Sequence, residues 1–343
     1  MPNTLGIVGN TRFSTDIAVA HGSSPYVTAY PWTAGGFGTK YSDPATVPTG
    51  TGRGVIFSPS AKDIVVGHFT SPFITAYPWS ASGFGTKYAN PATLPGGNCY
   101  HISFTPNGND VAVASATTPF VLAYPWSASG FGTKYANPAT LPAALGRSVA
   151  FSPTGEEIAV AHHTTPRITA YPWSAGFGTK YADPATVPTG NGIAIAFTLS
   201  DNTIAVAHET TPFISVYPWS SSGFGTKYAN PATLPTGSGG GVSFTPSGDD
   251  IAVAHNASPR LSVYPWSTSG FGTKYSDPAT TLLGNGQGVM FSANGSDIAA
   301  TSSDTTSTRF VVYPWSSSGF GTKYADPATI PAGFNLFTAW SPN

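Results

Sequence analysis

The sequence contains one cysteine, Cys99, and few charged residues. A single cysteine excludes an intrachain disulfide and a metal site built from several thiolates. Charged residues make up 8% of the 343 residues, about a third of the usual ~25%, and the formal net charge is −1. Nothing suggests the basic face that neutralises phosphates when proteins bind nucleic acids. We therefore expect no nucleic-acid partner and a fold that depends on packing.

Export and membrane signals are also lacking. The N-terminal residues MPNTLGIVGN have neither the basic region nor the apolar core of a signal peptide. No run of ~18 apolar residues could span a bilayer. The sequence thus predicts synthesis in a cytoplasm without a signal peptide, and no membrane insertion.

What the sequence does contain is one unit repeated seven times. Aligned on Tyr-Pro-Trp, the copies start at residues 30, 77, 124, 171, 217, 264 and 313, in steps of 46 to 49 residues. The unit read from residue 240 contains the short runs GVSF, DIAVAH, RLSVY and FGTKY, bounded by Gly, Pro, Ser and Asn, which is typical of strands and turns. Helical repeats of this length exist, but 32 Pro and 39 Gly leave no stretch long enough for paired helices.

Four antiparallel strands per unit match one blade of a β-propeller, and such rings have four to eight blades. The chain ends with Trp340-Ser341-Pro342, which aligns with Phe57-Ser58-Pro59, so it ends on a first strand. The first unit has a second strand at residues 16–21 but a poor first one. We predict an all-β fold, a single seven-bladed propeller over residues 1–343, with blade 1 built from roughly 11–46 plus 335–343. An open solenoid would need polar caps at both ends, and none is visible.

The pattern V-x-F-S/T-P-x-G-x-D-I-A-V-A resembles YVTN and WD40-like propeller repeats over nearly the whole chain. A standard WD40 unit has Trp-Asp where this chain has Tyr-Pro-Trp, so it departs from that pattern. The full unit, YPW followed by GFGTKY and PAT, is similar to tandem repeats in virion proteins of tailed bacteriophages. That second resemblance implies a structural protein located on a virion.

Two residues of every copy form candidate grooves between blades. We place the Trp in the turn after the third strand and the Lys on the fourth strand, and expect the Trp to pack between blades and the Lys to approach the Asp or Asn three residues on. The alternatives are sugar stacking for the Trp and docking of a neighbouring subunit for the Lys. The residues are Trp32, Trp79, Trp126, Trp173, Trp219, Trp266, Trp315, Lys40, Lys87, Lys134, Lys180, Lys227, Lys274 and Lys323.

Two further positions recur around the second strand. His21, His68, His162, His208 and His255 end it in five copies, and adjacent blades would hold them on the order of 10 Å apart, too far to share a zinc ion. We expect them to bond the following turn. The carboxylates that precede the strand are expected to act as turn residues; they are Asp16, Asp63, Asp110, Glu157, Asp250 and Asp297.

The copies differ most in two loops that should emerge on the same rim. Arg53, Tyr100 and Arg147 occupy equivalent places at the entry to three successive first strands. The loop after the second strand ends in Tyr26, Phe73, Phe120, Arg167, Phe213, Arg260 and Arg309. Random sequence drift in unconstrained loops would explain such variation. However, binding residues are often found on loops, and arginine and aromatic residues are frequent in interface hot spots. This rim is the candidate contact surface.

No Ser/His/Asp set, catalytic carboxylate pair or phosphate-binding glycine loop is evident, and GFGTK lacks Walker A spacing. We therefore expect no enzyme, no cofactor and no metal. The predicted function is a structural or interaction scaffold, a phage decoration, fibre or adhesin component that binds other virion or assembly subunits or a host-surface glycan. The alternatives are a multivalent lectin-like propeller and, third, a propeller hydrolase or lyase.

Overall fold

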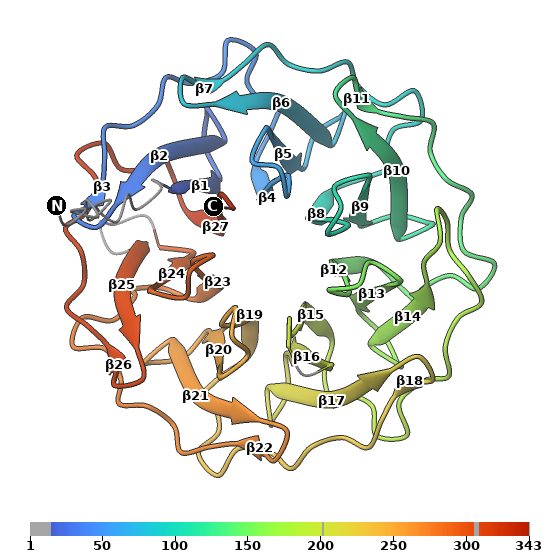
Figure 1. The fold of residues 1–343 in the computed structure, drawn as a ribbon, viewed down its shortest axis with the longest axis vertical. Coiled ribbons are helices and arrows are strands. Elements are labelled where there is room, and N and C mark those ends of the chain that lie inside the picture. The colour runs from blue at the N-terminus through green and yellow to red at the C-terminus, as the bar shows by residue number, and fades with distance from the viewer. Residues whose placement is uncertain (1–14, 201, 305–308, 343) are drawn as a thin grey trace, which may run out of the picture.

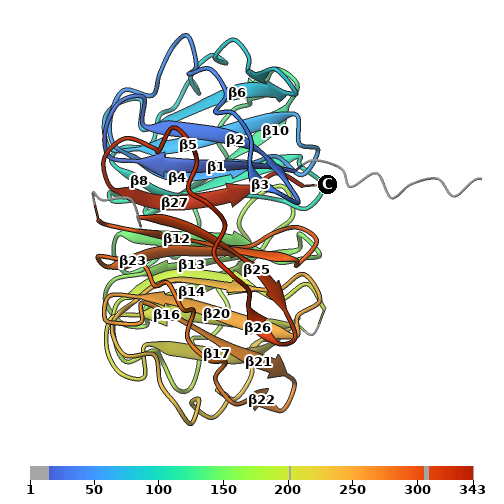
Figure 2. The same ribbon diagram turned by 90° about the vertical axis from the view of Figure 1, so that its left-hand side faces the viewer.

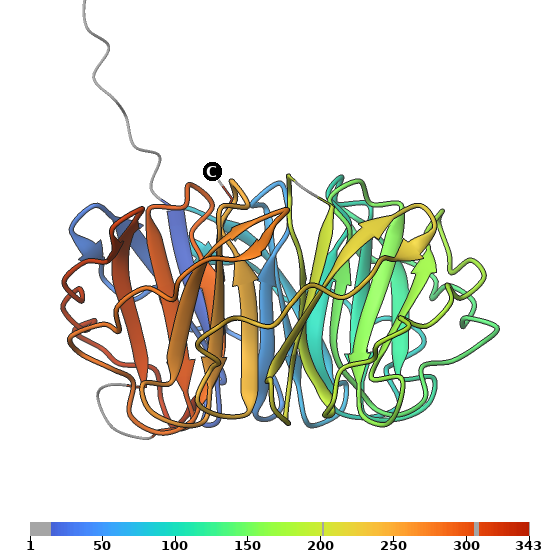
Figure 3. The same cartoon turned by 90° about the horizontal axis from the view of Figure 1, so that it is seen from below.

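The computed structural model describes residues 15–200, 202–304 and 309–342. Seven sheets stand around a central axis as a closed ring (Figure 1). From the side the ring is a disc, with the strands running roughly along the axis (Figures 2 and 3). The described residues contain strands and turns without a helix, so none of them forms a helix that could cross a membrane. The predicted all-β, seven-bladed propeller is confirmed.

Each blade is an antiparallel sheet whose first strand faces the axis. The first strands, in blade order, are β27 (Asn335–Trp340), β4 (Gly52–Phe57), β8 (Cys99–Phe104), β12 (Gly146–Phe151), β15 (Gly192–Phe197), β19 (Gly239–Phe244) and β23 (Gly286–Phe291). The second strands are β1 (Thr15–His21), β5 (Asp63–His68), β9 (Asp110–Ser115), β13 (Glu157–His162), β16 (Thr203–His208), β20 (Asp250–His255) and β24 (Asp297–Ser302). The third strands are β2 (Val27–Thr33), β6 (Ile74–Ser80), β10 (Val121–Ser127), β14 (Ile168–Pro172), β17 (Ile214–Ser220), β21 (Leu261–Ser267) and β25 (Phe310–Ser316).

The outermost strands are much shorter than the predicted FGTKY. They contain two residues each: β3 (Gly36–Phe37), β7 (Gly83–Phe84), β11 (Gly130–Phe131), β18 (Gly223–Phe224), β22 (Gly270–Phe271) and β26 (Gly319–Phe320). In blade 1 the Gly38 N–H still bonds the Pro31 carbonyl, but the next bond to this edge comes from Tyr41 to Ala29. Lys40, between these two bonds, therefore lies outside the hydrogen-bonded ladder of the sheet. In blade 4 the turn is one residue shorter, and a single bridge between Trp173 and Phe177 replaces the outer strand.

The ring closes through the C-terminal strand, as predicted. β27 is the first strand of blade 1 and pairs with β1, with Ile17 opposite Trp340 and Val19 opposite Thr338. β27 lies on the inner side of blade 1, next to the channel (Figure 1). The predicted extent of the domain, 1–343 with blade 1 from residue 11, stays a prediction, because residues 1–14 and 343 lie outside the described residues.

The third strand continues through the proline of Tyr-Pro-Trp instead of ending there. Pro78 lies opposite Asp63, and Trp79 pairs with Phe84 of the outer strand. Proline lacks only the N–H donor, and the Pro78 carbonyl still accepts a bond from Gly85. The prediction that the tryptophans lie in the turn is therefore wrong, since they belong to the strand or, in blade 4, to the bridge after it.

The hydrophobic core lies between blades. One cluster joins Ala18 and Val27 of blade 1 to Val55, Ile64 and Trp79 of blade 2, and similar clusters follow around the ring. Successive strand residues point to opposite faces, so each central strand contributes to two such contacts. Burial of one Val or Ile stabilises by about 1.5–3 kcal/mol, and nearly every residue of the second strands is buried.

Candidate functional site

The inner strands bring the second residue of each blade's first strand to one end of the central channel. These seven residues line a hollow at the channel mouth: Arg53, Tyr100, Arg147, Ile193, Gly240, Gln287 and Leu336. The enclosed space is about 20 Å³, which is room for about one water molecule. A larger ligand would therefore bind at the open side of the hollow.

Two arginines flank one aromatic ring in this hollow. The guanidinium carbon of Arg147 is 4.4 Å from the ring centroid of Tyr100, and that of Arg53 is 5.8 Å from it. Both distances are within the range of cation–π attraction. Phe69 contacts the same ring edge-on at 5.1 Å and holds it in place. The three residues that the repeat comparison singled out on successive blades thus form one cluster.

The cluster carries uncompensated positive charge. Burial, followed by repulsion from Arg147, lowers the pKa of Arg53 to about 10, so the side chain is still charged at neutral pH. No Asp or Glu is among the described residues that line the hollow. Guanidinium groups bind carboxylates and phosphates through paired hydrogen bonds. The arrangement is suited to an anionic ligand.

His101 lies next to this cluster with one ring nitrogen occupied. Its Nδ1 is 3.0 Å from the backbone carbonyl of Val149. A carbonyl can only accept, so Nδ1 carries the proton and Nε2 keeps its lone pair. Within the described residues Nε2 makes no hydrogen bond. Burial lowers the pKa of His101 to about 4, so the imidazole is neutral at pH 7.

A contact between His101 and Phe337 narrows the channel below the hollow. Their ring centroids are 4.6 Å apart and the rings meet edge to face. The two residues come from blades 3 and 1, and the intervening blade carries Gly54 at the equivalent position. A Cβ on Gly54 would come within 3.2 Å of the His101 Cα. Glycine at position 54 therefore lets the inner strands of blades 2 and 3 approach each other closely.

A second, larger cavity of about 300 Å³ lies on the other side of this contact. Its wall is mostly apolar and includes Ile56, Ala196 and Met290. His101 and Phe337 line both this cavity and the hollow. His101 therefore faces two spaces, one at each side of the narrow point.

The aromatic and arginine residues after the second strand do not join this site. None of them lines either channel cavity. Six adopt left-handed backbone conformations with φ between 66° and 70°: Tyr26, Phe73, Phe120, Arg167, Phe213 and Arg260. Their carbonyls, and that of Arg309, accept the N–H of the last residue of the second strand. They build the hairpin turns, and a role in partner binding stays a prediction.

The repeated tryptophans are buried between blades, as the packing interpretation predicts. They are 4–7% exposed and contact Phe and Tyr rings edge to face, as Trp79 does with Phe84 at 4.9 Å and Tyr41 at 5.0 Å. Such pairs contribute about 0.5–1.5 kcal/mol beyond area burial. No ring face is free for sugar stacking at this depth.

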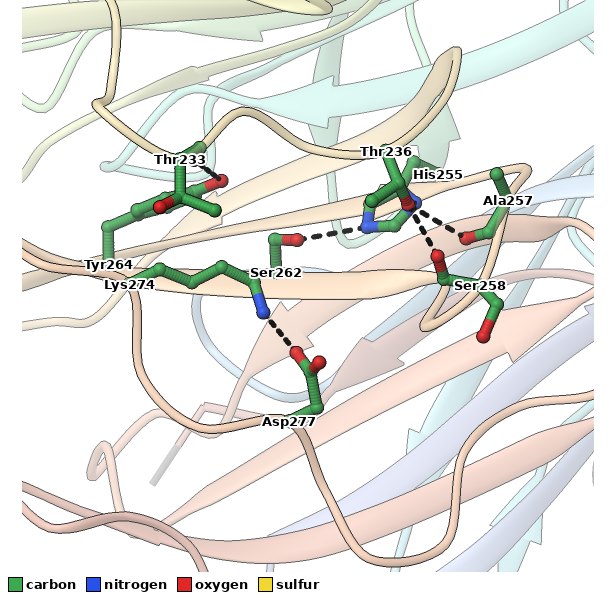
Figure 4. A network of polar contacts seen from close by, with 9 residues as sticks. All are labelled: Thr233, Thr236, His255, Ala257, Ser258, Ser262, Tyr264, Lys274 and Asp277. Atoms are coloured by element: carbon green, nitrogen blue, oxygen red, sulfur yellow. Dashed lines mark hydrogen bonds and ion pairs between the residues drawn. The ribbon is translucent and has the colours of Figure 1, made fainter.

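The seven lysines contact the residue three positions on, as predicted. The pairs are Lys40 with Asp43, Lys87 with Asn90, Lys134 with Asn137, Lys180 with Asp183, Lys227 with Asn230, Lys274 with Asp277 and Lys323 with Asp326. Figure 4 shows the Lys274 pair beside Tyr264, whose hydroxyl donates to the Thr233 carbonyl of the preceding linker at 2.9 Å. Docking of another subunit on this ring of lysines stays a prediction.

The histidines at the ends of the second strands bond the third strand, and His162 also bonds the following turn as predicted, with its Nδ1 2.7 Å from the His163 carbonyl. His255 Nε2 is 3.0 Å from the Ser262 hydroxyl of the third strand (Figure 4), and the other four are bonded in the same way. Burial is the largest cause that lowers the pKa of His21, His68, His208 and His255, to about 4. Among the described residues no three His, Cys, Asp or Glu side chains converge on a metal position.

The carboxylates before the second strands also differ from the prediction. Asp63 accepts the Tyr88 hydroxyl of its own repeat at 2.7 Å and the Trp126 indole N–H of the next blade at 3.2 Å. The same pair of bonds occurs at Asp16, Asp110, Asp250 and Asp297. These side chains join blades and are not turn residues. Glu157 of blade 4 does not follow this pattern. The indole N–H of Trp219, the equivalent tryptophan of blade 5, is buried without a partner.

Sequence reasoning missed His101, Phe69 and Gln287. For His101, a signal was present in the comparison of the repeat copies, at the position that follows Arg53, Tyr100 and Arg147. The third residue of the first strand reads Gly, His, Ser, Ala, Gly, Gly and Phe from blade 2 to blade 1, so His101 and Phe337 stand out by size. A single histidine at a varied position has no motif to distinguish it from drift.

No family model and no curated protein matches the sequence, so no match supports the resemblance to phage repeats. Solved structures do match the fold. The periplasmic gluconolactonase PpgL of Pseudomonas aeruginosa is 16% identical, with a TM-score of 0.72 over 96% of this chain and 99% of that one. A putative 6-phosphogluconolactonase from Bacteroides fragilis is 13% identical, with a TM-score of 0.76 over 99% of both chains. The Swd1 β-propeller domain of Myceliophthora thermophila is 14% identical, with a TM-score of 0.61 over 84% of this chain and 90% of that one.

These neighbours contradict the predicted function. We expected a non-enzymatic scaffold on a phage particle or, alternatively, a lectin-like propeller. Full-length structural neighbours are instead described as lactonases. At these identities the likeness shows the fold alone, and the chemistry of this chain has to come from its own site. The partners and the virion location stay predictions.

Proposed function

We propose that the chain hydrolyses a sugar lactone that carries a phosphate or carboxylate group, at the mouth of the central channel. The observation that carries the proposal is the pair of arginines, Arg53 and Arg147, on the Tyr100 ring without a carboxylate in the lining. An anion bound there offsets the mutual repulsion of the two guanidinium groups. The neighbours named for gluconolactone and 6-phosphogluconolactone chemistry support this reaction class.

The reaction suits such a site. Attack of water on a lactone carbonyl creates an oxyanion, and cationic donors in a partly dry pocket stabilise the developing charge. Arg147, the closer of the two to the ring, can hold the anionic group while Arg53 faces the carbonyl oxygen, or the reverse. The Gln287 amide, on the same rim, offers a further donor to sugar hydroxyls.

The test compares 6-phosphogluconolactone with gluconolactone, with acid release measured against spontaneous hydrolysis in buffer. We expect faster hydrolysis of the phosphorylated lactone. Each of Arg53→Gln and Arg147→Gln should lower kcat/KM for it about tenfold to a hundredfold, because a hydrogen bond to a charged group contributes roughly 1.5–3 kcal/mol. Arg260→Gln, in a turn outside the hollow, is the matched control. Hydrolysis of neither lactone above the buffer rate would refute the proposal.

A further inference from the structure

We propose that His101 is the general base of this hydrolysis, taking a proton from the attacking water through Nε2. The inference rests on the proposed function and names the residue that activates its nucleophile. Three observations support it: the fixed tautomer, the position of the ring, and the lack of another base in the two linings.

The tautomer of His101 is set by the backbone. The Val149 carbonyl, 3.0 Å from Nδ1, is an obligatory acceptor and keeps the proton on that nitrogen. The bond crosses from blade 3 to blade 4, so two inner strands hold the ring orientation. The Phe337 ring packs against it from blade 1 at 4.6 Å. Nε2 is left with a lone pair and no hydrogen bond to the described residues.

His101 lies where substrate and water would approach from different sides. It lines the hollow that contains Arg53 and Arg147, and it also lines the 300 Å³ cavity below. That cavity has room for several water molecules. An anionic lactone held on the arginines would cover the hollow, while water reaches His101 from the cavity.

No other described residue of the two linings can take a proton at neutral pH. The other titratable residues that line the hollow with His101 are Arg53, Arg147 and Tyr100, and a guanidinium group offers hydrogen-bond donors but no acceptor. The remaining lining residues are apolar, hydroxyl or amide side chains. The Cys99 thiol is bonded to the His101 carbonyl and buried, and burial raises its pKa above the usual range. His101, which burial keeps neutral, is the remaining candidate.

The step balances with water as the co-reactant. Nε2 accepts one proton as the water oxygen bonds to the lactone carbonyl carbon, and the carbonyl becomes an oxyanion facing an arginine. The ring C–O bond then breaks, and the imidazolium returns the proton to the departing alkoxide. The product is the open-chain hydroxy acid, which releases its carboxyl proton to solvent. His101 ends the cycle neutral.

The decisive variant is His101→Gln, which keeps a polar side chain without a base. We expect kcat for 6-phosphogluconolactone to fall by about 10²–10⁴-fold, the usual contribution of a general base, and KM to change by less than about threefold. Binding of the product, 6-phosphogluconate, measured by calorimetry, should be retained. Added imidazole should restore part of the activity of His101→Ala. His163→Gln, outside both linings, is the control and should keep kcat within about twofold.

The outcomes separate the two proposals. Wild-type hydrolysis with full kcat in a folded His101→Gln variant would overturn the inference and leave the proposed function standing. Absence of wild-type hydrolysis would overturn both. The pH profile of the wild type is a further test, with folding checked by circular dichroism at each pH: while the protein stays folded, kcat/KM should be flat from pH 7 to 5 and fall as pH approaches 4, where His101 becomes protonated. A fall centred near pH 6.5 would contradict the assignment.

Discussion

Cys99 on the first strand of blade 3 fills the space that Gly67 leaves on the second strand of blade 2. Both lie in the contact between these blades, and a Cβ on Gly67 would overlap the Cys99 sulfur. At three other joints the glycine is on the first strand and the larger residue is on the second strand of the preceding blade. The pairs there are Gly146 with Ala114, Gly192 with Ala161 and Gly239 with Ala207. At the contact between blades 2 and 3 the larger residue is therefore on the first strand, and the glycine is on the second.

The exchange predicts strong coupling between the two positions. Gly67→Ala should destabilise by about 1–3 kcal/mol, because overpacking displaces neighbours in a close-packed core. Cys99→Gly should also destabilise, since it leaves a cavity. The double variant recreates the Gly–Ala pair of the other blades and should regain most of the loss. Chemical denaturation of all four proteins measures the coupling energy, and additive effects would show that the two side chains do not compete for this space.

Glu157 offers a way to strengthen the contact between blades 4 and 5. The buried Trp219 indole N–H has no acceptor there, whereas an Asp serves the equivalent tryptophan at five other joints. Glu157→Asp should supply it and raise the free energy of unfolding by about 1 kcal/mol. Glu156→Asp, at the exposed neighbour, should leave the melting temperature unchanged. An equal effect of both changes would point to turn propensity instead of the indole bond.

The buried histidines predict acid sensitivity. Their folded pKa values lie near 4, below the ordinary 6.5, so the unfolded chain binds more protons between these values. The stability is complete above about pH 6.5 and declines as pH falls towards 4. Each such histidine contributes a loss of about 2 kcal/mol between pH 7 and 5, at 1.36 kcal/mol per pKa unit.

Blade 3 supplies the matched variant for this effect. Its strands carry Ser115 and Leu122 where blade 5 has His208 and Ser215. The double change His208→Ser with Ser215→Leu should therefore reduce the decline between pH 7 and 5 by about 2 kcal/mol. Denaturation curves at the two pH values measure it. An unchanged decline would mean that His208 does not carry the acid effect.

Ring closure can be tested by removal of the last ten residues, 334–343. The truncation leaves β1 without its partner β27 and removes Trp340, which packs against Trp32 at 5.1 Å and donates to the Met290 carbonyl. Loss of one buried Trp alone costs about 3–5 kcal/mol, so the truncated ring should melt far below the intact one. Trp340→Phe, the residue at this position in other blades, is the milder control. Melting within a degree of the full-length chain would contradict closure by this strand.

The sequence was sufficient for the architecture because each blade repeats the same local problem. The repeat period came from comparing the copies, and the strand runs could be read within one unit of about 47 residues. The first strand that ends at Trp340 without a second strand after it was found by aligning the two ends of the chain. The role of Asp63 could not, because one of its partners, Trp126, lies in the next blade. The fourth strand was overestimated for a related reason: the alternation of FGTKY fits a strand, but the Lys contact to Asp or Asn bends the chain out of the ladder.

The candidate site was found in part. Arg53, Tyr100 and Arg147 stood out because the copies disagree there, and the ring geometry brought them together. His101 was missed because its significance depends on Phe337, which is 236 positions away in the chain and approaches only through closure of the ring. The predicted second loop contributed turns instead, since its variable side chains share one left-handed backbone position.

A closed ring has no terminal repeat that can fray, so local opening must begin at a joint. The unmatched indole at Trp219 marks the joint between blades 4 and 5 as a weak seam. Amide hydrogens of β13 and β15 on either side of it are therefore expected to exchange with solvent before those at joints where an aspartate links two blades. A single extra methylene, in Glu157, would then decide where the disc first comes apart.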